Sequence, residues 1–187
     1  MLRYLLHARH WQVFLFSFGI LVLYRIIAVL TVFAGTGGGR QPDTSLIEGF
    51  ASVYPLFVFL ALLVYFLWIW AVAKHLNPLI DPQWRPPLLR FRLFFFLSLF
   101  YILALLVWVM LRGGLPFEYI YLLPVHFLVM CAFIYCVFFA AKTIRLVELQ
   151  RKLIFQDYFG EFVMVAMFPI GIWLLQPRVN RLAKENS

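Results

Sequence analysis

The chain has 187 residues, of which 65% are hydrophobic and 13% charged, and its mean hydropathy is +0.92. A soluble domain is about 45–50% apolar and about 25% charged, so this composition excludes a water-soluble fold and indicates one membrane domain over residues 1–187. In a soluble protein the net charge of +8 would suggest nucleic acid, but no basic stretch is long or regularly interleaved with aromatic residues, so nucleic acid is not an expected partner. We expect the basic residues to orient the chain and to contact anionic lipid headgroups.

Four apolar runs are long enough to cross a bilayer, whose hydrocarbon core requires about 20 helical residues. Backbone groups in lipid must be satisfied within the segment, so each run is predicted to be a helix. The fold class is therefore all-α, an integral membrane four-helix bundle. The predicted spans cover residues 13–34, 49–73, 93–111 and 119–141.

The first two spans contain residues that indicate where their helices begin or bend and whether they are retained. The first is longer than the apolar core of a signal peptide and contains Arg25, so we expect it to be retained. Before the second span, Ser45 and Glu48 form a capping box, which predicts that this helix begins near Ser45. Pro55 should bend it one turn inside the membrane.

The segments around the third span differ in character. Residues 74–92 contain four prolines, which forbid a continuous helix there. Residues 112–118 form a short turn with two glycines and a proline. The third and fourth spans should therefore pair as an antiparallel hairpin.

The fourth span is expected to continue beyond the membrane. No glycine or proline occurs over residues 125–159, which allows one helix of roughly 50 Å. Arg145, Glu148 and Lys152 would pair along one side of it. Residues 142–159 are thus predicted to be a cytoplasmic amphipathic extension that projects from the membrane or lies in its interface.

A fifth apolar run, residues 162–175, is too short for a straight crossing. Pro169 and Gly171 are expected to break its helix near the middle. The run is therefore predicted to be a half-buried segment, a short re-entrant or interfacial C-terminal helix.

Lys and Arg counts on the two sides set the expected orientation. Ten lie at the N-terminus, in the second loop and after the fourth span: Arg3, Arg9, Lys74, Arg85, Arg90, Arg92, Lys142, Arg145, Arg151 and Lys152. Only Arg40 and Arg112 lie on the opposite side. This bias predicts that both termini are cytoplasmic.

The first candidate site is an intramembrane or outer polar cluster. Arg25 lies deep in the first span, where an ionisable group is costly and needs a partner, an inward-facing position or a path to the headgroups. The candidate partners are Glu48, Glu118 and His126. The alternative is that Arg25 is anchored to outer headgroups and that one structural ion pair forms nearby.

The second candidate site gathers polar and interfacial residues at the cytoplasmic boundary. Its members come from both ends of the chain: His10, Trp11, Gln12, Asp157, Glu161, Gln176, Arg178 and Asn180. Two interpretations stay open. These side chains dock the C-terminal tail onto the bundle, or they form a recognition surface.

The same two ends carry a resemblance. HWQVFL at residues 10–15 and FPIGIWLLQPRVN at residues 168–180 resemble the HWQ-x-F-L start and the F-P-I-G-x-W-x-x-Q-P-R-x-N end of a group of small, uncharacterised bacterial inner-membrane proteins. The resemblance implies a bacterial inner membrane and suggests that the two ends form one device. It implies no activity.

The sequence contains little that indicates catalysis. Cys131 and His126 are five residues apart and turn away from each other on a helix, so they do not form a thiol–base pair. No zinc-protease or serine-hydrolase motif is present, and we expect no enzyme activity, cofactor or metal.

The favoured function is therefore a non-catalytic assembly subunit, scaffold or sensor/effector that acts through its cytoplasmic-side elements. Its expected partners are the lipid bilayer and either copies of itself or other subunits of a membrane complex. The alternative is a pore or ion channel formed by homo-oligomerisation, because a four-helix protomer is too small to enclose a channel of its own.

Overall fold

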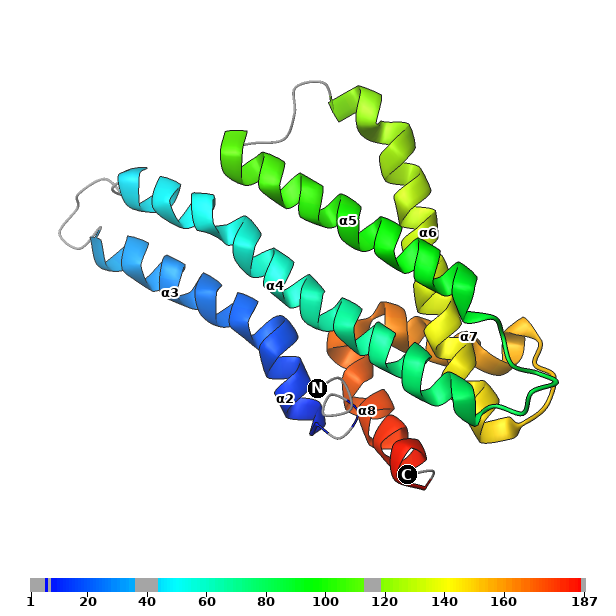
Figure 1. Ribbon diagram of the computed structural model, residues 1–187. Coiled ribbons are helices and arrows are strands. Elements are labelled where there is room, and N and C mark those ends of the chain that lie inside the picture. Colours follow the sequence, from blue (N-terminus) through cyan, green and yellow to red (C-terminus); the bar gives the residue numbers. More distant parts are fainter. Residues whose placement is uncertain (1–5, 7, 36–43, 113–118, 186–187) are drawn as a thin grey trace.

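The fold is seen in a computed structural model that describes residues 6, 8–35, 44–112 and 119–185 (Figure 1). Throughout these ranges the regular structure is helical, with no strand. Four helices in the described part are long and apolar enough to cross a membrane: His10–Gly35, Thr44–Leu79, Leu88–Arg112 and Leu122–Leu149. The predicted all-α bundle, with four helices long and apolar enough to span a membrane, is confirmed.

The first span combines α2 (His10–Phe14), the π-helical turn η1 (Leu15–Gly19) and α3 (Ile20–Gly35). At the π-turn, the buried Ser17 hydroxyl donates to the carbonyl of Val13 at 2.8 Å, bonding a polar group within its own helix. The span leads away from the end of the bundle where both termini lie, called below the terminal end (Figure 1).

The central helix is α4 (Thr44–Leu76), which is extended by the 3₁₀ turn η2 (Asn77–Leu79). It packs against α3, α5, α6 and α8. Its C-terminal half holds the core, where Trp68, Ile69 and Val72 are fully buried. Pro55 lies inside the N-terminal half of α4. We call the end of the bundle where α3 ends at Gly35 and α4 begins at Thr44 the loop end.

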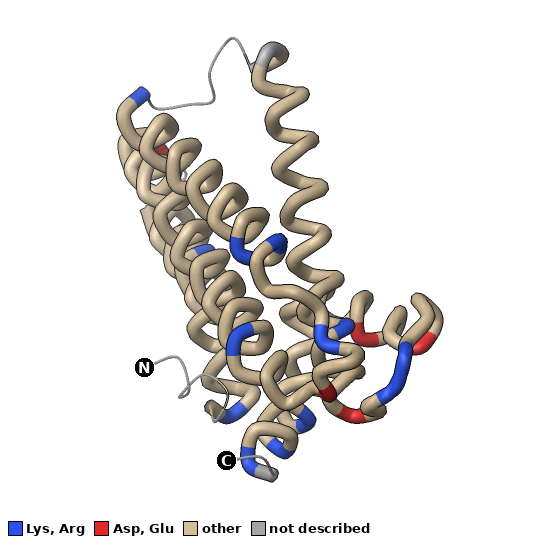
Figure 2. Tube along the Cα trace, turned by 45° about the vertical axis from the view of Figure 1, so that its right-hand side comes forward, with Lys and Arg blue, Asp and Glu red and all other residues tan. Residues whose placement is uncertain are grey.

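The third and fourth spans are α5 (Leu88–Arg112) and α6 (Tyr119–Leu149), which run antiparallel as expected. Near the terminal end they pack closely, and the rings of Phe91 and Phe139 stack at 4.8 Å. Toward Arg112 and Tyr119 the two helices diverge (Figures 1 and 2).

The continuous helix that the sequence allows over residues 125–159 does not form, because α6 ends at Leu149. Gln150 adopts a positive φ of 46°, and its side-chain amide donates to the carbonyl of Leu79 at 3.0 Å while its oxygen accepts from the Asp81 N–H at 2.9 Å. These bonds to a distant loop hold the chain in a turn that the absence of glycine and proline did not predict. A separate helix, α7 (Phe155–Ala166), follows.

The C-terminal segment is also longer and more helical than expected. The break lies at Met167, just before Pro169, and α8 then runs without interruption from Phe168 to Glu185, through Pro177. The predicted short run of residues 162–175 is therefore the junction of two helices. Both helices lie at the terminal end of the bundle (Figure 1).

The junction between α7 and α8 depends on one glycine. A Cβ atom placed on Gly171 would lie 1.8 Å from the main-chain oxygen of Met164. Only glycine allows the two backbones to approach this closely. The residue expected to break the helix is instead the point at which α8 contacts α7.

Candidate functional site

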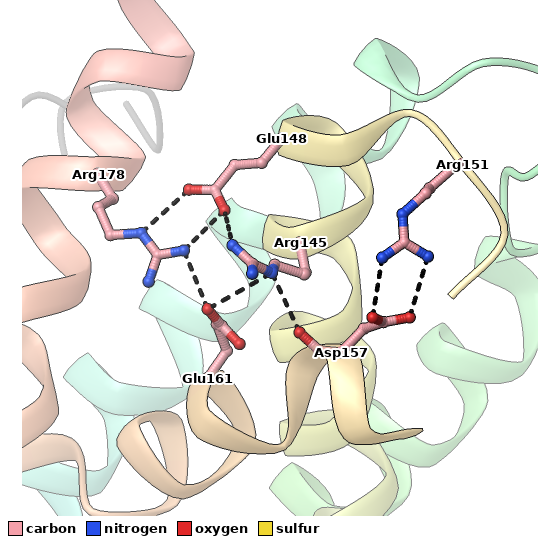
Figure 3. Close-up of polar contacts among 6 residues, drawn as sticks. All are labelled: Arg145, Glu148, Arg151, Asp157, Glu161 and Arg178. Atoms are coloured by element: carbon pink, nitrogen blue, oxygen red, sulfur yellow. Dashed lines mark hydrogen bonds and ion pairs between the residues drawn. The ribbon is translucent and has the colours of Figure 1, made fainter. Parts of the chain in front are cut away.

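The candidate site is a network of charged side chains where α6, α7 and α8 meet at the terminal end (Figure 3). Arg178 of α8 donates two hydrogen bonds to Glu148 of α6, from Nε to Oε1 at 3.0 Å and from Nη2 to Oε2 at 2.7 Å. Its Nη2 also donates to Oε1 of Glu161 on α7 at 3.0 Å. One guanidinium thus joins α6, α7 and α8. Its contact with Glu148 has the planar two-point geometry that suits an arginine.

Arg145 completes the network from α6. Its Nη1 lies 2.9 Å from Oε2 of Glu148, the pair expected from their spacing along one helix, and its Nε lies 3.9 Å from Oε1 of Glu161. The same Nε donates to the carbonyl of Asp157 at 3.1 Å. The positive charges of Arg145 and Arg178 therefore balance the negative charges of Glu148 and Glu161. This pairing stabilises the fold because Glu161 is only 6% exposed, and a buried carboxylate without a cation is costly.

Asp157 belongs to the edge of this network and lies in the first turn of α7. Its Oδ2 accepts from the Ile154 N–H at 2.9 Å, and its Oδ1 lies 2.9 Å from Nη2 of Arg151. The backbone hydrogen bond from Ile154 and then the Arg151 guanidinium hold the pKa of Asp157 below its ordinary value. Asp157 thus caps the start of α7 from its third position, by accepting from the N–H of Ile154, and is charged at neutral pH.

A second group, which we call the Gln176 latch, ties α8 to the centre of the bundle and to the N-terminal segment. Gln176 is fully buried, and its Oε1 accepts from Trp68 Nε1 at 2.6 Å. Its Nε2 donates to the carbonyl of Ala8 and to Oδ1 of Asn180, both at 3.0 Å. Asn180 Nδ2 donates to the same Ala8 carbonyl at 3.1 Å. The latch comprises Ala8, Trp68, Gln176 and Asn180.

Aromatic contacts extend the latch to α2. The ring of Trp173 lies 4.6 Å from that of His10 and 5.6 Å from that of Phe14. Gln12 caps α2 by accepting from the Arg9 N–H at 2.9 Å, whereas Trp11 is 45% exposed. The segment around Ala8 and His10 therefore contacts α8 directly.

The spacing of apolar residues in α8 explains how it presents these groups. Its buried side chains recur every three or four residues, which places them on one face of the helix. They are Phe168, Ile172, Leu175, Val179 and Leu182. Gln176 follows Leu175 on this buried face, while Arg178 is turned toward α6 and α7.

The structure divides the second candidate site, which was predicted at the cytoplasmic boundary, into two groups. It also adds members that sequence reasoning missed. Asp157, Glu161 and Arg178 belong to the charged network, while His10, Gln176 and Asn180 belong to the latch and its aromatic extension. The missed partners are Trp68 and Ala8. A tryptophan inside an apolar run does carry a signal, because its buried N–H requires an acceptor.

The predicted cluster around Arg25 does not assemble among the described residues. The Arg25 guanidinium lies over the ring of Tyr54, with Cζ 4.0 Å from the centroid, and no ion pair joins it to the exposed Glu48 within the described ranges. His126 of α6 is bonded instead to the Tyr101 hydroxyl of α5 at 3.1 Å. Glu118 lies outside the described residues.

Other chemistry is sparse in the part of the chain that the structure describes. Cys131 is exposed and Cys136 is buried, so the two thiols point to different sides of α6. No group of three His, Cys, Asp or Glu side chains that could hold a metal occurs among the described residues. The polar groups of the network bond to one another, as do those of the latch.

Comparisons with known proteins add no relative: no family model matches the chain, and no significant match occurs among curated proteins or solved structures.

Proposed function

We propose that this chain is a non-catalytic, multi-pass protein of a bacterial inner membrane that serves as an assembly subunit or scaffold. In this proposal α7 and α8 form a rigid surface on the cytoplasmic side, to which another membrane subunit or a second copy binds. The charged network and the Gln176 latch stabilise this surface and perform no chemistry.

One observation carries the proposal: α7 and α8 are fixed to the bundle and yet still present an apolar face. The charged network and the latch hold their inner faces. Large hydrophobic side chains remain exposed on the other side, with Phe159 50%, Ile170 66% and Leu174 60% exposed. A rigid apolar face is typical of an interaction surface, because binding there costs little ordering entropy.

The distribution of charge supports the proposed orientation. Lys and Arg gather toward the terminal end of the bundle, where both termini lie (Figure 2). Cytoplasmic segments of membrane proteins carry such an excess, which is also attracted to anionic lipid headgroups. In this orientation α7 and α8 lie at the cytoplasmic interface.

Site-specific photocrosslinking in living cells tests the proposal. A photoreactive residue at position 159 should give a discrete protein adduct, with a second copy or with another subunit. The same residue at position 30, where Leu30 of α3 is 63% exposed at a spanning surface, is the matched control and should give none. Equal adducts at both positions, or none at either, would contradict the proposed surface.

A second measurement separates assembly from conduction. The mass of the complex in mild detergent should fall when Phe159 is replaced by Ser and stay unchanged when Leu30 is replaced by Ser. The purified protein should be silent in planar bilayers. A symmetric oligomer with reproducible conductance would overturn the proposal in favour of a pore.

A further inference from the structure

Arg25 occupies an unusual position on the lipid-facing side of the bundle. It lies on α3, ten residues before the end of that helix at Gly35, or about 15 Å along the axis. The 26-residue span is about 39 Å long against a hydrocarbon core of about 30 Å. If the span extends equally beyond the hydrocarbon core at both ends, Arg25 lies roughly 10 Å inside the apolar layer. A long arginine side chain and a lipid headgroup can together bridge this depth.

The Arg25 charge lacks a carboxylate partner in the described part of the chain, where its contact is the face of Tyr54. A guanidinium that stacks on a ring leaves its N–H groups at the edge, in the plane that suits two-point binding of a phosphate. No hydrogen bond from these N–H groups to a described residue is present. The stacking fixes the cation without consuming its donors.

A groove between α3 and α4 begins at this guanidinium. Its volume is about 440 Å³, and it runs toward the loop end of the bundle between Val29 and Phe33 on one side and Ile47 and Ala51 on the other. The walls are almost entirely apolar, and Arg25 supplies the charge. An occupant must therefore combine an anion with an apolar body.

The aromatic floor of the groove is preorganised. The ring of Tyr24 stacks on Phe57 at 4.4 Å and on Tyr54 at 6.0 Å. The Tyr24 hydroxyl donates to the carbonyl of Phe50 on α4, which holds the two helices in register. The groove is thus a formed feature of the α3–α4 pair and needs little rearrangement to bind a ligand.

We propose that this groove, here called the Arg25 groove, binds one anionic phospholipid from the leaflet at the loop end. The phosphate accepts hydrogen bonds from the Arg25 guanidinium, and one acyl chain lies against the apolar walls. The charge complementarity and the apolar lining together select this occupant over a soluble anion, which would leave the walls exposed. This site is separate from the surface of α7 and α8 in the proposed function.

The test compares lipid retention by the full chain in nanodiscs that contain phosphatidylglycerol and phosphatidylcholine, with bound lipid measured by native mass spectrometry after transfer to detergent. Arg25→Gln should lower the preference for phosphatidylglycerol about tenfold, the effect of losing a charge-assisted hydrogen bond. Arg112→Gln is the matched control, because Arg112 also lies over an aromatic ring, that of Trp108, near the same end of the bundle. It should keep the wild-type preference.

A second variant tests the groove itself. Ala28→Leu adds volume to the groove wall and leaves Arg25 in place, so it should also reduce retention. This variant keeps the proposal testable if Arg25→Gln does not fold. Equal losses in the Arg25 and Arg112 variants would show diffuse attraction and overturn the proposal. Full retention by Ala28→Leu, or displacement of the lipid by soluble glycerol phosphate, would overturn it as well.

Discussion

Trp68 and Gln176, 108 positions apart in the chain, share a hydrogen bond of 2.6 Å with both side chains fully buried. Trp68 lies in the core of α4, and Gln176 lies on the buried face of α8. A buried amide in an apolar core is costly unless its oxygen and its NH₂ group are both bonded. Here Trp68 satisfies the oxygen, while Ala8 and Asn180 satisfy the nitrogen.

Gln176→Leu should therefore lower the free energy of unfolding by about 1–3 kcal/mol, although it preserves volume and adds apolar character. The loss arises because the Trp68 N–H becomes a buried donor with no acceptor. Thermal unfolding in detergent, followed by tryptophan fluorescence, measures it. In a double-mutant cycle, Trp68→Phe and Gln176→Leu should be coupled. Additive effects of the two substitutions would contradict the latch.

Arg178→Met should destabilise the packing of α8 on α6 and α7, because it removes one of the two arginines that pair with Glu148 and Glu161, and the one that joins them to α8. We expect a cost of about 2 kcal/mol, below that of a fully buried pair, since the Arg178 side chain is 27% exposed. Hydrogen exchange of α8 amides measures the loosening. Arg181→Met, at an exposed position of the same helix, is the control and should leave the exchange unchanged.

The spanning helices could be predicted from the sequence because one physical requirement dominates them. A helix in lipid must be long, apolar and internally hydrogen-bonded, and the four predicted spans satisfy all three conditions. The end of α6 was missed because its cause is not local. Gln150 turns the chain by bonding to Leu79 and Asp81, about 70 positions earlier.

The site residues were partly predictable for a related reason. A polar residue in an apolar stretch is conspicuous, so Gln176, Arg178 and Glu161 could be selected from sequence. Their partners could not be assigned, because the pairing depends on how α8 folds back against α4 and α6. Arg25 was equally conspicuous, but its partner is the aromatic ring of Tyr54. The sequence does not distinguish an aromatic residue that binds a cation from one that only packs in the core.

Gly171→Ala should separate α7 from α8, since the added Cβ would meet the Met164 carbonyl at 1.8 Å. The backbones cannot both stay in place, and we expect a cost of about 1–3 kcal/mol or more, as in other overpacked sites. Gly160→Ala provides the control. A Cβ at Gly160 of α7 meets nothing within 4 Å, so this change should be neutral or stabilising by up to about 1 kcal/mol.

The two glycine variants are distinguished by thermal unfolding in detergent and by proteolysis near Met167. Gly171→Ala should unfold at a lower temperature and be cut faster at the junction of α7 and α8. If both variants behaved like the wild type, the close approach of Gly171 to Met164 would be wrong.

Asp157 should give the start of α7 an acid-sensitive component. Its pKa is lowered by the Ile154 hydrogen bond and the Arg151 ion pair, so its stabilising effect is present above the pKa of an unfolded aspartate, about 3.9. The effect is lost as the pH falls through the lower pKa of the folded state. The amide NMR signal of Ile154, whose N–H donates to Asp157, should therefore titrate with a midpoint below about 3.9. Asp157→Asn should abolish this titration, and a midpoint above the unfolded value would show that the carboxylate does not cap α7.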